Sequence, residues 1–217
     1  MVKNGQNKRI IVLGDHIGVA KYHPVDNVFE GIKQSLDSLG EILLCTEYES
    51  ICVEELQSYD FVVNYIDRYD LINSFGVELH KFIKRGGRVL NLHNGILCTL
   101  GDSRLEASFG GRFVTHPPYG RIICEIDRSL DWLSHIHDFV VDEEAYIIQE
   151  NGALPHKKYL YCIYEGMKIA AGWIIDEHPY CVGYLGLGHD GRTFENEHVR
   201  QLLRHVARHL MYANCTV

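Results

Sequence analysis

The sequence predicts an α/β fold in which one mainly parallel sheet lies between layers of helices. Short apolar runs alternate with amphipathic patterns of helical period through the first hundred residues. Parallel strands need crossover connections, so this alternation favours a doubly wound sheet. The chain of 217 residues is long enough for one sizeable core, and no Pro/Ser-rich linker interrupts it. We therefore expect one domain over residues 1–217.

Strand and helix signals follow one another regularly in the first half of the chain. Lys8–Leu13 is a β-branched run, and a helical pattern of apolar residues after it stops at Gly40. The members of that pattern are Val28, Phe29, Ile32, Leu36 and Leu39. The other strands expected here are Glu41–Cys45, Asp60–Tyr65 and the run that ends at His93, and the other helices are Val53–Gln57 and Leu71–Lys84.

The second half of the chain is richer in strand signals. Gly110–Pro118 predicts an irregular segment with a short strand, and a final helix begins at Glu197. The strands expected between them are Arg121–Glu125, Phe139–Val141, Tyr159–Tyr164, Lys168–Ile175 and Cys181–Leu185. We interpret them as an extension of the same sheet with peripheral hairpins. The parallel part should contain the strands that end near Leu13, Cys45, Tyr65, Leu92 and Leu185.

Composition excludes several classes of function. The formal charge of −8 disfavours affinity for phosphate backbones, so we expect no nucleic-acid partner. No apolar run approaches the roughly 20 residues of a membrane span. The polar residues 1–9 do not resemble a signal peptide, which leads us to expect a cytoplasmic protein without a membrane partner. Seven cysteines without a C-x-x-C pair predict neither a disulfide framework nor a zinc ribbon.

The clearest candidate for chemistry is His93. It follows a buried strand and precedes Asn94-Gly95, a small-residue pair that allows a sharp strand-to-helix bend. Ligands of open α/β sheets bind at the carboxyl ends of the strands, where His93 is expected. The alternative is that it merely caps the strand. Cys98 lies three residues further on, where a helical turn would carry it away from the bend, so a Cys-His amidase mechanism is disfavoured.

Further candidates lie at the ends of other segments. Glu144 and His189 follow two predicted strands, and His116 stands beside two prolines. Burial between apolar residues can raise the pKa of a carboxyl group, which would suit Glu144 for general-base work near neutral pH. The alternatives are a helix N-cap or surface acid for Glu144 and a turn histidine for His189.

The loop after the first strand is unusually long. It covers Gly14–Asn27 and contains His16 and His23, whereas βα connections commonly have 2–6 residues. Its start lacks both the G-x-G-x-x-G spacing and the P-loop lysine. A nucleotide cofactor is therefore weakly supported, and the loop is a candidate for substrate contacts.

Four motifs together resemble the trehalose-utilisation (ThuA-like) family, which is similar to the class I glutamine amidotransferase-like superfamily. They cover residues 86–95, 110–117, 143–146 and 186–190. The resemblance implies a flavodoxin-like three-layer sandwich in which His93 replaces the elbow cysteine. It also implies that one pocket is lined by His93, His116, Glu144, Tyr146 and His189, with His16 or His23 contributing from the first loop.

The resemblance leads us to expect a carbohydrate-processing enzyme that acts on a keto-glycoside or related sugar. Proton abstraction beside a carbonyl, or hydrolysis, needs a base and an acid. Glu144 or His93 would be the base and His189 or Tyr146 the acid. Asn94 and His116 would orient the substrate, and further substrate contacts would come from Tyr146, Asp190, His16 and His23. The rival hypothesis is a non-catalytic sugar-binding or regulatory module. Glutamine amide hydrolysis would need a cysteine at position 93.

The same candidate residues lead to expectations about cofactors and partners. Acid–base chemistry requires no redox cofactor. Several histidines with Glu144 could bind a divalent metal, but no H-x-x-x-H or H-E-x-x-H pair fixes two ligands on one helix, so metal-free catalysis is preferred. The expected partner is a small-molecule sugar, and the sequence leaves a homo-oligomer open.

Overall fold

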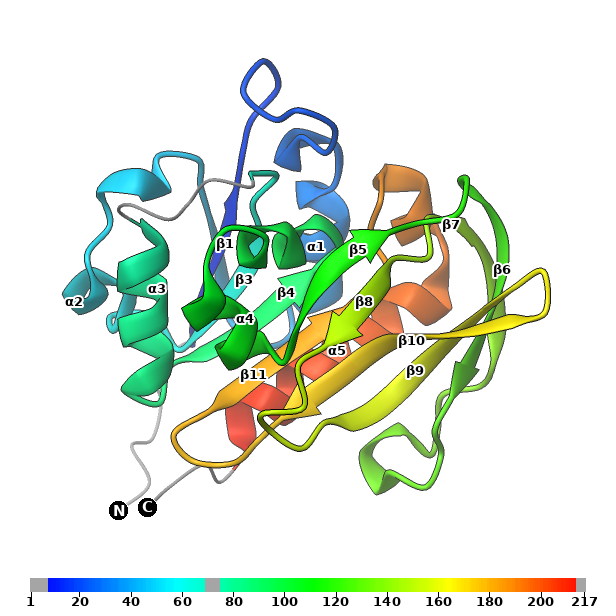
Figure 1. Ribbon diagram of the computed structural model, residues 1–217. Helices are drawn as coiled ribbons and strands as arrows, with labels where there is room; N and C mark the ends of the chain where they lie inside the picture. The colour runs from blue at the N-terminus through cyan, green and yellow to red at the C-terminus, as the bar shows by residue number, and fades with distance from the viewer. Residues whose placement is uncertain (1–7, 69–74, 214–217) are drawn as a thin grey trace.

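The structure, a computed structural model, describes residues 8–68 and 75–213. Within these ranges the chain forms one nine-stranded sheet with the order β2-β1-β3-β4-β11-β10-β9-β6-β7 (Figure 1). The strands of this sheet are β1 (Arg9–Gly14), β2 (Glu41–Cys45), β3 (Phe61–Tyr65), β4 (Arg88–Leu92), β6 (Gly120–Ile126), β7 (Phe139–Glu143), β9 (Lys157–Tyr164), β10 (Met167–Ile175) and β11 (Cys181–Leu185).

The sheet has a parallel half and an antiparallel half. Strands β2, β1, β3, β4 and β11 pair in parallel, which confirms the five strands predicted for this part. Strands β10, β9, β6 and β7 continue the sheet by antiparallel pairing. Each antiparallel partner reverses the chain direction, so β7 again runs with the parallel strands. The carboxyl end of β7 therefore lies at the same edge of the sheet as the carboxyl ends of β4 and β11.

Helices cover both faces of the parallel half, which confirms the predicted α/β sandwich. In β1, Ile10 and Val12 pack in one buried cluster and Ile11 and Leu13 in the other, because side chains alternate along a strand. The helices are α1 (Phe29–Leu36), α2 (Val53–Leu56), α3 (Phe75–Lys84), α4 (Ser103–Phe109) and α5 (Glu197–Tyr212). Helices α1 and α5 lie on one face, and α2, α3 and α4 lie on the other (Figure 1).

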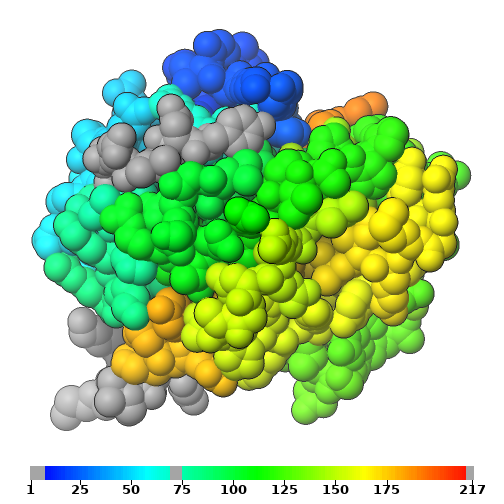
Figure 2. Space-filling view, viewed as in Figure 1, coloured from blue at the N-terminus to red at the C-terminus, as the bar shows by residue number. Residues whose placement is uncertain are grey.

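Helix α4 and strand β8 (Ile147–Glu150) were absent from the prediction. Helix α4 begins at the N-cap Asp102, whose side chain accepts from the backbone of Arg104 and Leu105, and it ends at Gly110 in the left-handed conformation. Strand β8 pairs with β5 (Gly111–Thr115) in a separate two-stranded sheet. This pairing joins segments far apart in sequence, which explains why no local hairpin signal marked it. On the face of the molecule shown in Figure 2, the segment of α4 and β5 lies beside the segment that leads from β8 into β9.

Some sequence expectations fall on undescribed residues. Residues 71–74 of the predicted helix Leu71–Lys84 lie outside the described ranges, as do residues 1–7. Over 8–68 and 75–213, no helix combines the length and the apolar character needed to cross a membrane.

Candidate active site

A sharp turn follows β4 and places His93 at the carboxyl edge of the sheet. His93 has a φ of 45°, in the left-handed region that residues with side chains rarely adopt, and a 3-10 helix, η4 (His93–Thr99), follows directly. Two residues later a Cβ on Gly95 would lie 2.0 Å from the backbone oxygen of Asn64. Only glycine allows η4 to approach β3 this closely, so the turn has the character of the elbow that the sequence predicted.

The side chain of His93 is fully buried and its tautomer is fixed. Its Nδ1 lies 3.0 Å from the carbonyl oxygen of Gly186. A carbonyl can only accept, so Nδ1 carries the proton and donates it. Burial holds the pKa of His93 well below its ordinary value, and the imidazole is therefore neutral. Its Nε2 is left with an unshared lone pair, is buried, and finds no hydrogen-bond partner among the described residues.

Two adjacent glutamates at the end of β7 have different environments. Glu143 is fully buried and accepts from the backbone N–H groups of Gly188, His189 and Glu144 and from the hydroxyl of Thr193. It therefore positions the loop that carries His189. Burial raises the pKa of Glu143 to about 7, although its backbone hydrogen bonds act in the opposite direction.

The sequence expectation for the pKa of Glu144 is corrected by the structure. Burial alone would raise the pKa of Glu144, but the imidazoles of His189 and His23 outweigh it and hold that pKa well below its usual range. The carboxyl group whose pKa is raised by burial is its neighbour Glu143. Glu144 is therefore ionised near neutral pH and directs a carboxylate at the histidines.

The long first loop contributes His23. Asp67, two residues beyond β3, accepts from the backbone N–H groups of Tyr22 and His23 at 2.5 and 3.0 Å. It also accepts from Nδ1 of His23 at 3.3 Å. Burial by itself lowers the pKa of His23, but the carboxylates of Asp67 and Glu144 outweigh it and raise that pKa to about 9. Asp67 thus fixes the ring of His23 with Nε2 turned toward the other candidate residues.

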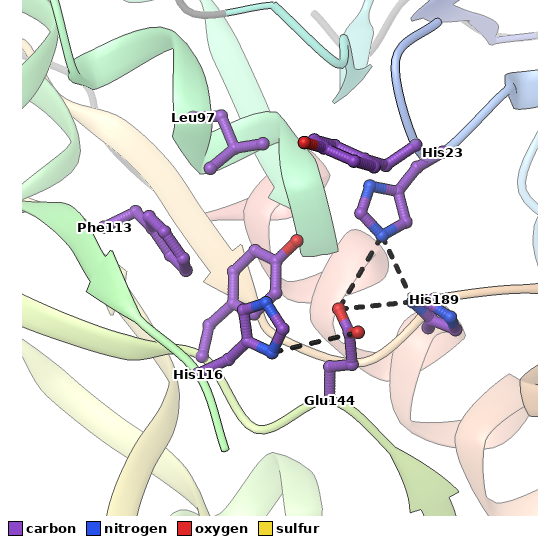
Figure 3. Close-up of a pocket in the computed structure, with 8 residues that line it drawn as sticks. His23, Leu97, Phe113, His116, Glu144 and His189 are labelled. Atoms are coloured by element: carbon purple, nitrogen blue, oxygen red, sulfur yellow. Dashed lines mark hydrogen bonds and ion pairs between the residues drawn. The ribbon is translucent and has the colours of Figure 1, made fainter. Parts of the chain in front are cut away.

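Three histidines and one carboxylate meet at this edge. Nε2 of His23 lies 3.1 Å from Nδ1 of His189, which lies 3.4 Å from Oε2 of Glu144. The same carboxylate oxygen lies 3.8 Å from Nε2 of His23 and 4.0 Å from Nε2 of His93. Figure 3 shows His23, His189 and Glu144 turned toward one another, with His116 on the other side of the carboxylate. We call His23, His93, Glu144 and His189 the histidine–glutamate cluster.

A cavity of about 490 Å³ opens beside the histidine–glutamate cluster. This volume lies in the range of small-molecule sites. Its polar side is formed by imidazoles and Glu144, and its other walls are aromatic or apolar (Figure 3). The residues that line it are Tyr22, His23, Leu97, Phe113, His116, Glu144, Tyr146 and His189. His93 is not among them, but its ring centroid lies 4.4 Å from that of the lining residue Tyr146.

Three residues expected to contact substrate lie elsewhere, which corrects the sequence interpretation. His16 lines a different depression, together with Glu47 and other residues. Asn94 is buried and donates to the carbonyl of Tyr65 at 2.9 Å. Asp190 directs its carboxylate at Arg192 and is not among the residues that line the cavity. Each follows a candidate strand end, but none of the three is among the residues that line the cavity.

Sequence reasoning missed two carboxylates that hold the site. The alternation of buried residues along β7, Phe139, Val141 and then Glu143, is a signal that could have placed Glu143 inside. The sequence signal for Asp67 is weaker, because Asp67 does not follow β3 directly but lies two residues beyond its end. Its contact with His23 depends on the path of the long first loop, which no local pattern describes.

Cys98 is not a candidate nucleophile. Burial raises the pKa of its thiol to about 12, and its Sγ lies 3.6 Å from Nδ2 of Asn64, away from the cavity. We expect Cys98→Ala to change turnover of any substrate less than about threefold, because a thiol held in the neutral form is a poor nucleophile. Steady-state kinetics would check this, and a loss of activity in a variant with normal thermal unfolding would contradict it.

Comparison with known proteins gives the fold and no close relative. No family model matches the chain, and no curated protein is similar to it in sequence. Among solved structures, a ThuA-like protein from Parabacteroides merdae has a TM-score of 0.78 at 10% identity, covering 95% of this chain and 91% of the other. A ThuA-like protein from Bacteroides uniformis has a TM-score of 0.75 at 14% identity, covering 96% and 92%.

A glutamine amidotransferase from Thermotoga maritima has a more distant likeness. Its TM-score is 0.59 at 10% identity, and 96% of this chain and all of that chain are covered. At these identities the likeness shows the fold alone. The chain thus has the fold of the ThuA-like proteins and of the glutamine amidotransferase, as the sequence motifs predicted.

Proposed function

We propose that this chain, which has the ThuA-like fold, is a carbohydrate-processing enzyme that acts on a keto-glycoside or related sugar. The observation that carries the proposal is the histidine–glutamate cluster beside a partly aromatic cavity. Imidazole and carboxylate groups accept and donate the protons of such a reaction, and aromatic rings pack against the apolar faces of sugar rings. The sugar class itself follows from the resemblance to the trehalose-utilisation family.

The ionisation states support acid–base chemistry on a carbonyl compound. A carbonyl group acidifies the neighbouring C–H bond, so its removal needs a base close to the carbon and a donor close to the oxygen. Glu144 is ionised and His93 is neutral, which suits either of them to accept a proton. His23 has a raised pKa and carries a proton near neutral pH, which suits it to donate to the oxygen. Hydrolysis of a glycosidic bond would use the same pairs.

Kinetics on a panel of keto-glycosides, with the unoxidised glycosides as controls, tests the proposal. We expect turnover of at least one keto-glycoside and a loss of roughly 10²–10⁴-fold in Glu144→Gln, because the amide cannot accept a proton. His137, which is exposed on a distant loop, provides the control variant His137→Ala, whose turnover should equal that of the parent.

Two results would contradict the proposal. Full turnover in a folded Glu144→Gln protein would remove the carboxylate from the chemistry. Binding of keto-sugars by the parent without any turnover would instead support a non-catalytic sugar-binding module, in which the fold is kept without the reaction.

A further inference from the structure

We propose that the histidine–glutamate cluster binds a divalent transition-metal ion through His23, His93, Glu144 and His189. These four side chains offer three imidazole nitrogens and one carboxylate oxygen, all within 4.8 Å of one another. The site itself depends only on this geometry, whereas its use in catalysis rests on the proposed function.

Two of the imidazoles are fixed in the orientation that metal ligands require. Nδ1 of His93 donates to the carbonyl of Gly186, and Nδ1 of His23 faces the carboxylate of Asp67. Each bond directs Nε2 of the ring into the cluster. A second hydrogen bond from the far nitrogen to a carbonyl or carboxylate is the usual arrangement around metal-ligating histidines, because it fixes the tautomer and the ring plane.

The distances within the cluster are close to those of a coordination shell. Two donor atoms at roughly 2.1 Å from one ion can be at most about 4.2 Å apart. The four distances already given, between His23 and His189 and from Glu144 to each histidine, are 3.1, 3.4, 3.8 and 4.0 Å. The remaining donor pairs are bounded only by 4.8 Å, so the side chains must move closer together before all four donors can reach a common centre.

His93 supplies an independent argument for a cation. Its Nε2 is buried and turned toward the cluster, and no hydrogen-bond donor reaches it within the described part of the chain. A buried acceptor without a partner is costly and rare in native proteins. A bound cation would satisfy this lone pair, because Nδ1 of the same ring is already committed to the carbonyl of Gly186.

The donor set indicates the class of ion. Imidazole nitrogens with one carboxylate favour Zn²⁺ and its neighbours in the first transition row over Mg²⁺ or Ca²⁺, which prefer oxygen ligands. The cavity adjoins the cluster on the side of His23, Glu144 and His189, so a substrate could approach a bound ion from there. An ion of this class would then polarise a sugar carbonyl, in the place that the proposed function gives to His23.

Metal binding can be measured without any substrate. The full chain, purified without a histidine tag and stripped with a chelator, would be titrated with Zn²⁺ by calorimetry and with Co²⁺ by visible absorption. We expect one equivalent to bind and the absorption of Co²⁺ to rise as nitrogen ligands replace water. Glu144→Gln and His93→Ala should each weaken binding by about 100-fold or more.

The matched control is His137→Ala. His137 is exposed and is not one of the four donors, so the variant removes an imidazole without touching the cluster. Its affinity for Zn²⁺ should stay within about threefold of the parent. If His93→Ala fails to fold, as judged by circular dichroism, Glu144→Gln together with His189→Ala decides the question.

These measurements distinguish a failure of the metal-site proposal from a failure of the proposed function. No binding by the parent, or equal affinity in the parent and in folded Glu144→Gln, would overturn the metal site. Keto-sugar turnover by metal-free protein would then still support the acid–base reaction. One tightly bound equivalent that is lost in the ligand variants supports the site even if no keto-glycoside is turned over.

Discussion

Glu143→Ala is expected to lower the free energy of unfolding by roughly 3–5 kcal/mol, because it leaves several buried donors without an acceptor. The carboxylate accepts three backbone N–H groups and one hydroxyl, from Gly188, His189, Glu144 and Thr193. Each donor left unpaired costs about 1–3 kcal/mol. Urea denaturation followed by circular dichroism would measure the change.

Two further variants make this prediction specific. Glu143→Gln keeps an oxygen for the donors of the 188–193 loop but places an amide N–H₂ near the backbone N–H of Glu144, so we expect a smaller loss. Glu125→Ala removes an exposed glutamate that is paired with Lys168 on the neighbouring part of the sheet, and it should cost less than about 1 kcal/mol. Equal stability of Glu143→Ala and Glu125→Ala would show that the buried carboxylate does not hold the loop.

Gly95→Ala is expected to lower the free energy of unfolding by roughly 2–4 kcal/mol, since overpacking against backbone cannot be relieved by a side-chain rotation. The added Cβ would lie 2.0 Å from the backbone oxygen of Asn64. Either η4 moves away from β3 or β3 itself shifts, and both would displace the neighbouring His93. Denaturation curves would report the loss of stability, and Zn²⁺ affinity would report the displacement.

Gly120→Ala is the matched control for Gly95→Ala. Gly120 is the first residue of β6, and a Cβ there would have its nearest neighbour at 3.7 Å, an ordinary van der Waals contact. We expect no loss of stability beyond about 0.5 kcal/mol, because neither space nor backbone conformation opposes the methyl group. A destabilisation of Gly120→Ala as large as that of Gly95→Ala would mean that the contact with Asn64 is not the cause.

The candidate site could be predicted from sequence only where a residue lies within a few residues of the end of a strand. His93 and Glu144 lie immediately after β4 and β7, and His189 lies four residues after β11, so the strand pattern placed all three near a sheet edge. The structure brings them together because β7 returns to the direction of the parallel strands after an even number of antiparallel steps. Their catalytic roles stay predictions.

The sequence by itself determined the parallel half of the sheet, the helices α1, α2, α3 and α5 that pack on it, and the sharp turn at His93. Hydrophobic periodicity and small-residue turns are local signals, and they specify these features without reference to the rest of the chain. Only the tertiary structure decided that His23 rather than His16 joins the cluster and that Asp67 orients the ring of His23. It also decided that burial raises the pKa of Glu143 and not that of Glu144. Those outcomes depend on loop paths and on contacts between segments distant in sequence, which no local pattern encodes.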